Sequence, residues 1–158
     1  MKITDKYVLF WDGVFSQWEP SVFIIDGVTY SSAEQYMMHQ KALLFGDKEI
    51  AAEVMLVTNP ADHKALGRRV KGYDDAIWKR HCLAIVYKGN YAKFTQNKDL
   101  GQQLINTGTR TLVEASPVDF IWGIERGEND PLSLDPSAWR GTNLLGSALM
   151  LVRNEIMN

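Results

Sequence analysis

The sequence predicts an α+β fold: one mostly helical domain over residues 1–158, with a small β-sheet. Three observations lead to this prediction. Segments with helical periodicity and capping residues dominate positions 31–106, short β-branched and aromatic runs lie before and after them, and there are no repeats, low-complexity tracts or linkers. A chain of 158 residues is also long enough to bury a sizeable core as one domain.

Two β-elements are expected ahead of the helices. Residues 7–11 form an aromatic and β-branched run that is typical of a strand. Residues 22–25 and 28–30 flank the pair Asp26-Gly27, which predicts a β-hairpin with a type I′ turn, because both central positions of that turn need positive φ.

Five helices are expected next. The first begins at Ser31 and ends near Gly46. The others are predicted at residues 47–56 (capped by Asp47), 59–70 (with Pro60 in the first turn), 74–94 and 97–106. Gly89 lies inside the longest pattern and costs about 1 kcal/mol relative to alanine, so a break there is an open alternative.

The C-terminal part predicts two strands, at residues 111–115 and 120–124, and a final helix at 144–157. Residues 126–142 are rich in Gly, Asp, Asn, Pro and Ser, which predicts a long loop. Loops of this length in compact domains are usually functional or disordered, and Trp139 argues against disorder.

Composition narrows the function classes. The net charge is −2, so binding to nucleic acid would require a local basic patch. Six side chains could form one, although such runs are more often the solvated faces of helices: Lys64, Arg68, Arg69, Lys71, Lys79 and Arg80. Cys82 is the single cysteine, which excludes an internal disulfide, and it is expected to be a buried, inert thiol.

Membrane insertion is not expected. The N-terminal residues contain no long apolar segment, and no stretch approaches the 18 apolar residues of a membrane helix. We therefore expect a cytoplasmic protein without a membrane partner.

The first predicted helix carries the main candidate for chemistry. Glu34 and Lys41 are seven residues apart, a spacing that places them on nearly one face of a helix, about 10 Å apart along its axis. A small polar substrate could lie between them, and His39 could serve as a base. Two structural alternatives remain: Ser31-x-x-Glu34 is also a capping box, and Lys41 alone could be a surface lysine.

Two further groups of residues suit a nucleotide-like ligand. Aromatic side chains could stack on a planar ring, although core packing explains most of them: Tyr7, Phe10, Trp11, Phe15, Trp18, Trp122 and Trp139. Arg140, backbone amides and the start of the last helix could hold a phosphate, or could simply form an ordinary helix start.

Several enzyme classes lack their motifs. There is no HExxH or paired metal spacing, no GxSxG elbow, no Walker A loop and no GxGxxG after a strand. We therefore expect no metal and no cofactor. The residues alone predict an α+β domain that binds a nucleotide-like ligand.

The order of the motifs resembles the NADAR family, also called YbiA-like, over nearly the whole chain. The motifs are Phe10-Trp11, Phe15-Ser16-Gln17-Trp18, Asp26-Gly27-Val28-Thr29-Tyr30, Ala33-Glu34-Gln35-Tyr36-Met37 with Lys41-Ala42, Gly67-Arg68, Trp78, Trp122-Gly123-Ile124, Asp130-Pro131, and residues 139–150 from Trp139-Arg140-Gly141-Thr142-Asn143 to Ala148-Leu149-Met150. Each motif is weak alone, but their shared order is specific.

The resemblance implies a YbiA-like fold and hydrolysis of the C1′–N bond between a base and a phosphorylated ribose. The substrate would be either a ribosylamino-pyrimidine phosphate of the riboflavin pathway or ADP-ribose attached to guanine in nucleic acid. Glu34 would stabilise the oxocarbenium-like cation or activate water. Lys41 would act as a general acid or, as the resemblance favours, attack C1′ and form a Schiff base.

The resemblance also implies substrate-binding roles for a second set of residues. These are Phe15, Gln17, Trp18, Trp122, Gly123, Arg140 and Asn143. Many relatives have asparagine where this chain has Gln17, which puts a ribose or phosphate contact there in doubt. Arg68 and Arg69 are candidates for a basic rim if the substrate is nucleic acid. A non-catalytic module that binds ADP-ribose is the alternative function.

Overall fold

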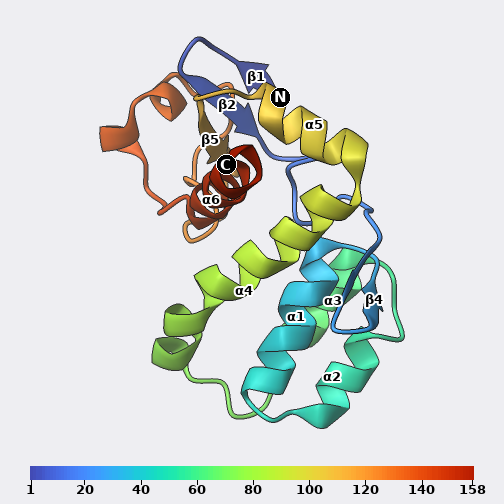
Figure 1. Ribbon diagram of the computed structural model, residues 1–158. Helices are drawn as coiled ribbons and strands as arrows, with labels where there is room; N and C mark the ends of the chain where they lie inside the picture. Colours follow the sequence, from blue (N-terminus) through green and yellow to red (C-terminus); the bar gives the residue numbers. More distant parts are fainter. The chain divides into compact units, whose positions relative to one another are not determined.

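The computed structural model describes all 158 residues and contains two compact units (Figure 1). The helical unit is Pro20–Asn97, and the sheet unit combines Met1–Glu19 with Lys98–Asn158. The α-helices are α1 (Ala33–Leu44), α2 (Lys48–Val54), α3 (Pro60–Gly67), α4 (Asp75–Gln96), α5 (Lys98–Asn106) and α6 (Leu144–Met157). The strands are β1 (Lys2–Ile3), β2 (Tyr7–Phe10), β3 (Phe23–Ile25), β4 (Val28–Tyr30) and β5 (Thr111–Glu114). The α+β class is confirmed.

The helical unit begins with the predicted hairpin. Strands β3 and β4 are antiparallel, and the turn residues Asp26 and Gly27 have φ values of 51° and 79°, which confirms the expected positive φ at both positions. The Gln96 side chain completes the edge of β3: its Oε1 accepts from Ile24 N at 2.8 Å and its Nε2 donates to Ile24 O at 2.8 Å. The hairpin is therefore fixed to the C-terminal end of α4.

Helix α1 packs against α2, α3 and α4. Helix α4 runs unbroken through Gly89, so the possible break there does not occur. A Cβ at position 89 would lie 2.7 Å from Cδ2 of Tyr36, a residue of α1 that is only 3% exposed. Gly89 thus permits the close approach of the Tyr36 ring.

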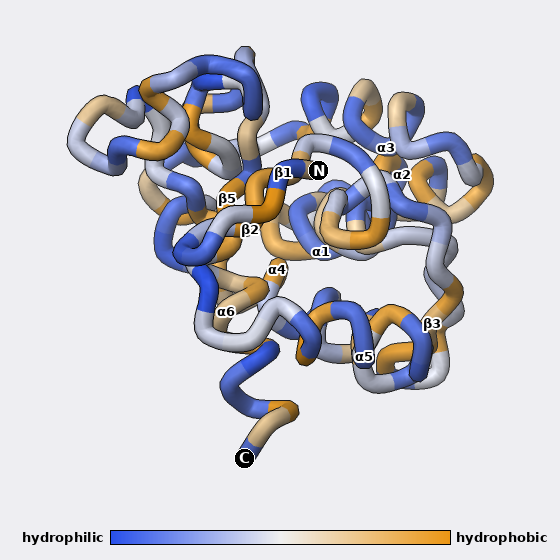
Figure 2. The backbone as a smooth tube through the Cα atoms, turned by 90° about the horizontal axis from the view of Figure 1, so that it is seen from above, coloured by the Kyte–Doolittle hydropathy of each residue, from blue (hydrophilic) through white to orange (hydrophobic).

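The sheet unit has the strand order β1-β2-β5, with β1 antiparallel and β5 parallel to β2. The apolar residues of β2, visible as hydrophobic in Figure 2, are buried together with those of β5. Helix α6 packs against β5. The core includes Leu9, Val113, Ala115 and Ile124. A parallel pair needs a crossover connection, and here the connection from β2 to β5 contains all of residues 20–97.

The second strand predicted for the C-terminal part, at residues 120–124, is wrong. The amides of Ile121 and Trp122 donate to Oδ1 of Asp119 at 2.9 and 2.8 Å, and the carbonyls of residues 120–124 accept from amides of residues 140–145. Side-chain turn bonds therefore replace a strand ladder here.

The long loop predicted at residues 126–142 is ordered and contains two short 3₁₀ helices, η1 (Pro131–Leu134) and η2 (Pro136–Ala138). The indole Nε1 of Trp139 donates to Ser133 O at 2.8 Å, and Nε of Arg126 donates to Ala138 O at 2.7 Å. These two contacts hold the loop against itself.

The expected burial of the single cysteine is confirmed, and two further observations complete the description of the fold. Cys82 is a buried free thiol, as predicted, and burial raises its pKa. None of the helices combines the length and the apolar character needed to cross a membrane. No group of three or more His, Cys, Asp or Glu side chains is placed to hold a metal ion.

Candidate functional site

The N-cap of helix α1 lies one residue later than the sequence suggests. Ser32 is its N-cap, with the side chain accepting from Gln35 N at 3.2 Å. The Gln35 Oε1 in turn accepts from Ser31 N at 2.7 Å and from Ser31 Oγ at 3.0 Å. The capping box expected for Ser31 and Glu34 is therefore wrong, because Ser32 and Gln35 form the cap.

Glu34 and Lys41 share an electrostatic environment on α1. Glu34 is buried, with 4% exposure, and Lys41 is partly buried. Burial lowers the pKa of Lys41, the negative charge of Glu34 opposes this shift, and the positive charge of Arg68 adds to it. An amine with a lowered pKa is more often neutral near pH 7, which a nucleophilic lysine requires.

Two aromatic rings contact the Lys41 amine. Its Nζ lies 4.7 Å from the ring centroid of Tyr73 and 5.7 Å from that of Trp78. Tyr73 belongs to the turn before α4, and Trp78 is in the first part of α4. Sequence reasoning did not connect these rings to Lys41: Tyr73 was not singled out, and Trp78 was named only as one motif of the family resemblance.

Arg68 and Arg69 differ in their partners, although they are neighbours at the end of α3. Arg69 Nη1 lies 3.9 Å from Glu53 Oε2, whereas no ion pair joins Arg68 to an acid. In the rest of the predicted basic patch, Lys79 pairs with Asp75 at 2.8 Å. Arg68 is thus an exposed cation close enough to Lys41 to affect its pKa.

The histidines have mostly structural partners. His39 Nδ1 lies 2.8 Å from the Tyr30 hydroxyl, which also accepts from Gln40 Nε2 at 3.4 Å, and burial lowers the pKa of His39. His63 is fully buried with its Nε2 2.7 Å from Val57 O. His81 is exposed.

The remaining predicted site residues belong to the sheet unit. Phe15 is 2% exposed and packs edge-on against Phe10 at 5.6 Å, which is a core position. Gln17 is also buried, Trp122 is partly exposed, and Trp18 is 44% exposed. Of these four, the two tryptophans have ring surface available for stacking.

Trp122, Gly123, Arg140 and Asn143 lie in two backbone segments that bond to each other. Arg140 N donates to Ile124 O at 3.0 Å, Asn143 N to Gly123 O at 3.0 Å and Leu145 N to Trp122 O at 3.2 Å. A Cβ on Gly141 would overlap Gly123 O, so this pairing needs glycine at position 141. The amides of residues 140–145 already donate to carbonyls of residues 120–124, which favours the alternative of an ordinary helix start, and a phosphate contact by the Arg140 side chain stays a prediction.

Asn143 connects α6 to β5. Its backbone is left-handed, with φ of 52°, its Oδ1 accepts from Glu114 N at 3.0 Å and its Nδ2 donates to Leu112 O at 3.0 Å. Gly146 permits this contact, since a Cβ there would overlap both Leu112 O and the Asn143 amide. The Asn143 side chain thus positions the start of α6.

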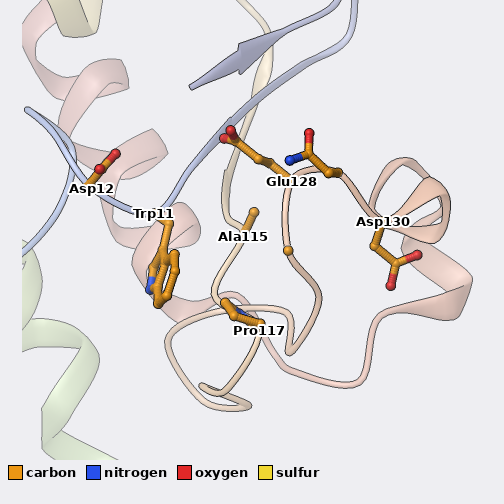
Figure 3. A pocket seen from close by; sticks show the side chains of 8 residues that line it. Trp11, Asp12, Ala115, Pro117, Glu128 and Asp130 are labelled. Carbon is orange, nitrogen blue, oxygen red and sulfur yellow. The ribbon is translucent and has the colours of Figure 1, made fainter.

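The sheet unit also contains a pocket of about 310 Å³ at the carboxyl ends of the parallel strands β2 and β5 (Figure 3). Ligands of parallel sheets commonly bind at this end. Its lining is an exposed indole with acidic and small residues around it: Trp11, Asp12, Ala115, Pro117, Gly127, Glu128, Asn129 and Asp130. Such a lining suits a planar ring with hydrogen-bond donors better than it suits a phosphate. Sequence reasoning named Trp11 as an aromatic, Asp130 as part of a motif and residues 126–142 as a long loop, but it did not bring these residues together as a site.

The chain is similar to a known protein family, to named proteins and to a solved structure. A model of the NADAR domain family matches residues 9–157. The N-glycosidase R617 of Acanthamoeba polyphaga mimivirus is 44% identical over 165 residues, which cover 96% of this chain and 97% of that protein. The chloroplastic riboflavin biosynthesis protein PYRR of Zea mays is 30% identical over 162 residues, which cover 93% of this chain and 24% of that protein. The NMR structure of the E. coli protein YbiA matches 99% of this chain and 88% of that one, with a TM-score of 0.79 and 26% identity.

Proposed function

Because this chain belongs to the NADAR domain family and is a hydrolase of N-glycosyl bonds, we propose that it cleaves the C1′–N bond between a base and a phosphorylated ribose. The observation that carries this proposal is the pairing of Glu34 and Lys41 on α1. A buried carboxylate and an amine with a lowered pKa supply the acid–base and nucleophilic groups that such a cleavage uses.

Lys41 acts as the nucleophile in the proposed reaction. The lone pair of Nζ bonds to C1′ while the C1′–N bond breaks, and the base leaves with that electron pair and takes the proton that Nζ gives up. The nitrogen lone pair then expels O4′ of the ribose, which takes a proton, so that an iminium joins Lys41 to C1′. Water adds to C1′ and releases the sugar aldehyde and the free amine. The alternative is that Lys41 only protonates the leaving base.

Glu34 has two tasks in this scheme. It transfers protons between Nζ, the base and O4′, and its negative charge stabilises the cationic character that develops at C1′. Both tasks depend on a carboxylate that is shielded from bulk water, and the 4% exposure of Glu34 supports this.

The substrate-binding roles extend to other side chains. Arg68, which lacks an acidic partner, is a candidate ligand of the phosphate, and Arg140 is another exposed candidate. Trp18 and Trp122 offer stacking surface. Gly123, Gln17 and Phe15 remain predicted contacts, and for Asn143 we propose a positioning role, since its amide bonds to β5.

Two substrates fit the proposal. The similarity to a riboflavin biosynthesis protein supports a ribosylamino-pyrimidine phosphate. ADP-ribosylated guanine is the second candidate, and for nucleic acid the exposed Arg68 and Arg69 could contact the backbone. A cytoplasmic setting remains a prediction.

To test the proposal, the protein would be incubated with each of these two compounds, and the release of free base would be measured by chromatography. Glu34→Gln should slow release at least about 100-fold, whereas the matched change Glu53→Gln, at a partly exposed acid paired with Arg69, should not. Full activity of Glu34→Gln would contradict the assigned role. Binding of ADP-ribose without release from either compound would support the binding-module alternative.

A further inference from the structure

The Lys41 amine lies against a pair of aromatic rings whose positions are fixed by other contacts. The Tyr73 hydroxyl donates to Asp75 Oδ1 at 2.9 Å, and the Tyr73 ring packs edge-on against Phe45 at a centroid distance of 5.3 Å. Trp78 is held in α4 and is 9% exposed. The rings are therefore in place before any ligand arrives.

We propose that Tyr73 and Trp78 form an aromatic cradle that positions Nζ of Lys41 and stabilises the positive charge this nitrogen carries, first as an ammonium and then as the iminium joined to C1′. The faces of aromatic rings attract cations within about 6 Å of the centroid, and both rings meet that distance. Stabilisation of the ammonium is inferred from these contacts alone, whereas stabilisation of the iminium also rests on the proposed function.

The surroundings of Lys41 have opposing effects on the charge of Nζ, and the cradle explains how that charge is stabilised. Burial and the neighbouring Arg68 both disfavour charge on Nζ, while Glu34 favours it. A nucleophilic amine must be neutral to attack but must also tolerate the positive charge that it gains on bonding to C1′. Aromatic faces stabilise that charge without forming a bond that the attack would have to break.

Charged groups also lie near the cradle, so their effect on Lys41 must be distinguished from that of the aromatic rings. Glu34 and Arg68 act on Lys41 directly, and Asp75 faces the cradle through its bond to the Tyr73 hydroxyl. Burial, with this hydrogen bond, raises the pKa of Tyr73 to about 12, so its ring is a neutral phenol at neutral pH. Attraction of Nζ to Tyr73 therefore comes from the ring face.

The test measures the pKa of Lys41 without substrate, by NMR titration of protein carrying ¹³C at the lysine Cε, with the Lys41 signal assigned by its absence in Lys41→Arg. Tyr73→Leu should lower this pKa by about 0.5 to 1.5 units, the range of a partly desolvated cation–π contact. Tyr73→Phe keeps the ring and removes the bond to Asp75, and it should change the pKa little. Tyr91→Leu is the matched control, since Tyr91 is 40% exposed and Tyr73 is 43% exposed.

A Lys41 pKa in Tyr73→Leu that equals the value in the parent protein would overturn the cradle. A second readout uses substrate at a pH above the Lys41 pKa found in the titration, where the amine starts neutral and only the iminium depends on the rings. There, borohydride trapping of the iminium should slow by about twofold to thirtyfold in Tyr73→Leu and not in Tyr73→Phe. If the pKa shifts as expected but the parent protein traps nothing, the cradle stands for the ammonium and the Schiff-base part of the proposed function fails.

Discussion

At the scale of single residues, α1 places two opposite charges in unequal surroundings. Glu34 is almost completely shielded from solvent, whereas Lys41 is partly exposed and touches two rings. An acid and an amine seven residues apart on a helix need no tertiary contact to share a face. What tertiary structure adds is the burial and the neighbouring charges that adjust the Lys41 pKa.

Arg68 gives a prediction with its neighbour as control. If Arg68 binds the substrate phosphate, Arg68→Ala should raise KM by about 10- to 100-fold, the value of a charge-assisted hydrogen bond, with a smaller effect on kcat. Arg69→Ala should change KM little, because Arg69 pairs with Glu53. Steady-state kinetics with each variant would reveal this difference, and equal effects of the two changes would exclude a specific role for Arg68.

His39 gives a prediction about pH and stability. Burial lowers its pKa in the folded protein, so the unfolded chain, with a value of about 6.5, binds the proton more tightly. The free energy of unfolding should therefore fall as pH drops below about 6.5, and this part of the loss should end below the folded-state pKa.

Urea unfolding at about pH 5 and about pH 8 measures this dependence in the parent protein and in His39→Gln. The loss of stability at the lower pH should be smaller in His39→Gln. His81→Gln, at an exposed histidine, should behave like the parent protein. An identical pH dependence in all three proteins would contradict the assignment to His39.

Residue-level features were predictable where they depend on nearby sequence. The spacing of Glu34 and Lys41 could be identified, but the cap was assigned one residue too early because Ser31 and Ser32 are both good cap residues. The contact between Tyr73 and Lys41 joins a turn to a helix over 32 residues of chain (73 − 41 = 32), and no local pattern indicates it.

At the scale of elements, α4 shows how packing overrides helix propensity. Alanine at position 89 would favour the helix by about 1 kcal/mol over glycine, yet its Cβ would lie 2.7 Å from the buried Tyr36 ring. Overpacking usually costs about 1–3 kcal/mol, so after the propensity gain of about 1 kcal/mol Gly89→Ala should lower the free energy of unfolding by up to about 2 kcal/mol. Thermal and urea unfolding measure it.

An exposed position of the same helix is the control. Ala84→Gly should cost about 1 kcal/mol from propensity alone. Stabilisation by Gly89→Ala would show that Tyr36 can move aside, and the close-approach explanation would then be wrong.

The elements that could be predicted from the sequence are those with a periodic pattern of apolar residues or with residues typical of a helix start. Helix starts were predicted at Asp47 from its cap residue, at Asn59 from the following proline and at Asp74 from the helical pattern, and in the structure all three side chains are N-caps. Residues 120–124 have the composition of a strand, but hydrogen bonds from Asp119 and from residues 140–145 shape them as a turn. Pairing with a distant loop cannot be seen in composition.

At the scale of the whole molecule, the chain passes from the sheet unit into the helical unit and then returns to the sheet unit. The strands β2 and β5 pair in parallel, and the helical unit is the connection between them. The sequence gives no linker at either boundary, and the family model spans residues of both units. The expectation of a single domain remains a prediction.

Each variant discussed above must be shown to be folded before its activity is interpreted. Glu34 and Lys41 belong to the helical unit, whereas Trp122, Gly123, Arg140 and Asn143 belong to the sheet unit. Loss of activity in a variant therefore has meaning only when its unfolding transition matches that of the parent protein, and each assay should be paired with an unfolding curve.

The central claim is that an N-glycosyl bond is cleaved through Lys41, and reductive trapping tests it most directly. The protein would be incubated with a ribosylamino-pyrimidine phosphate, or with ADP-ribosylated guanine DNA, in the presence of borohydride, and its peptides analysed by mass spectrometry. We expect a stable sugar adduct on the peptide that contains Lys41, with at least one free base released for each adduct, and no adduct in Lys41→Arg. Rapid base release with no adduct on Lys41, or undiminished release by Lys41→Arg, would contradict the account.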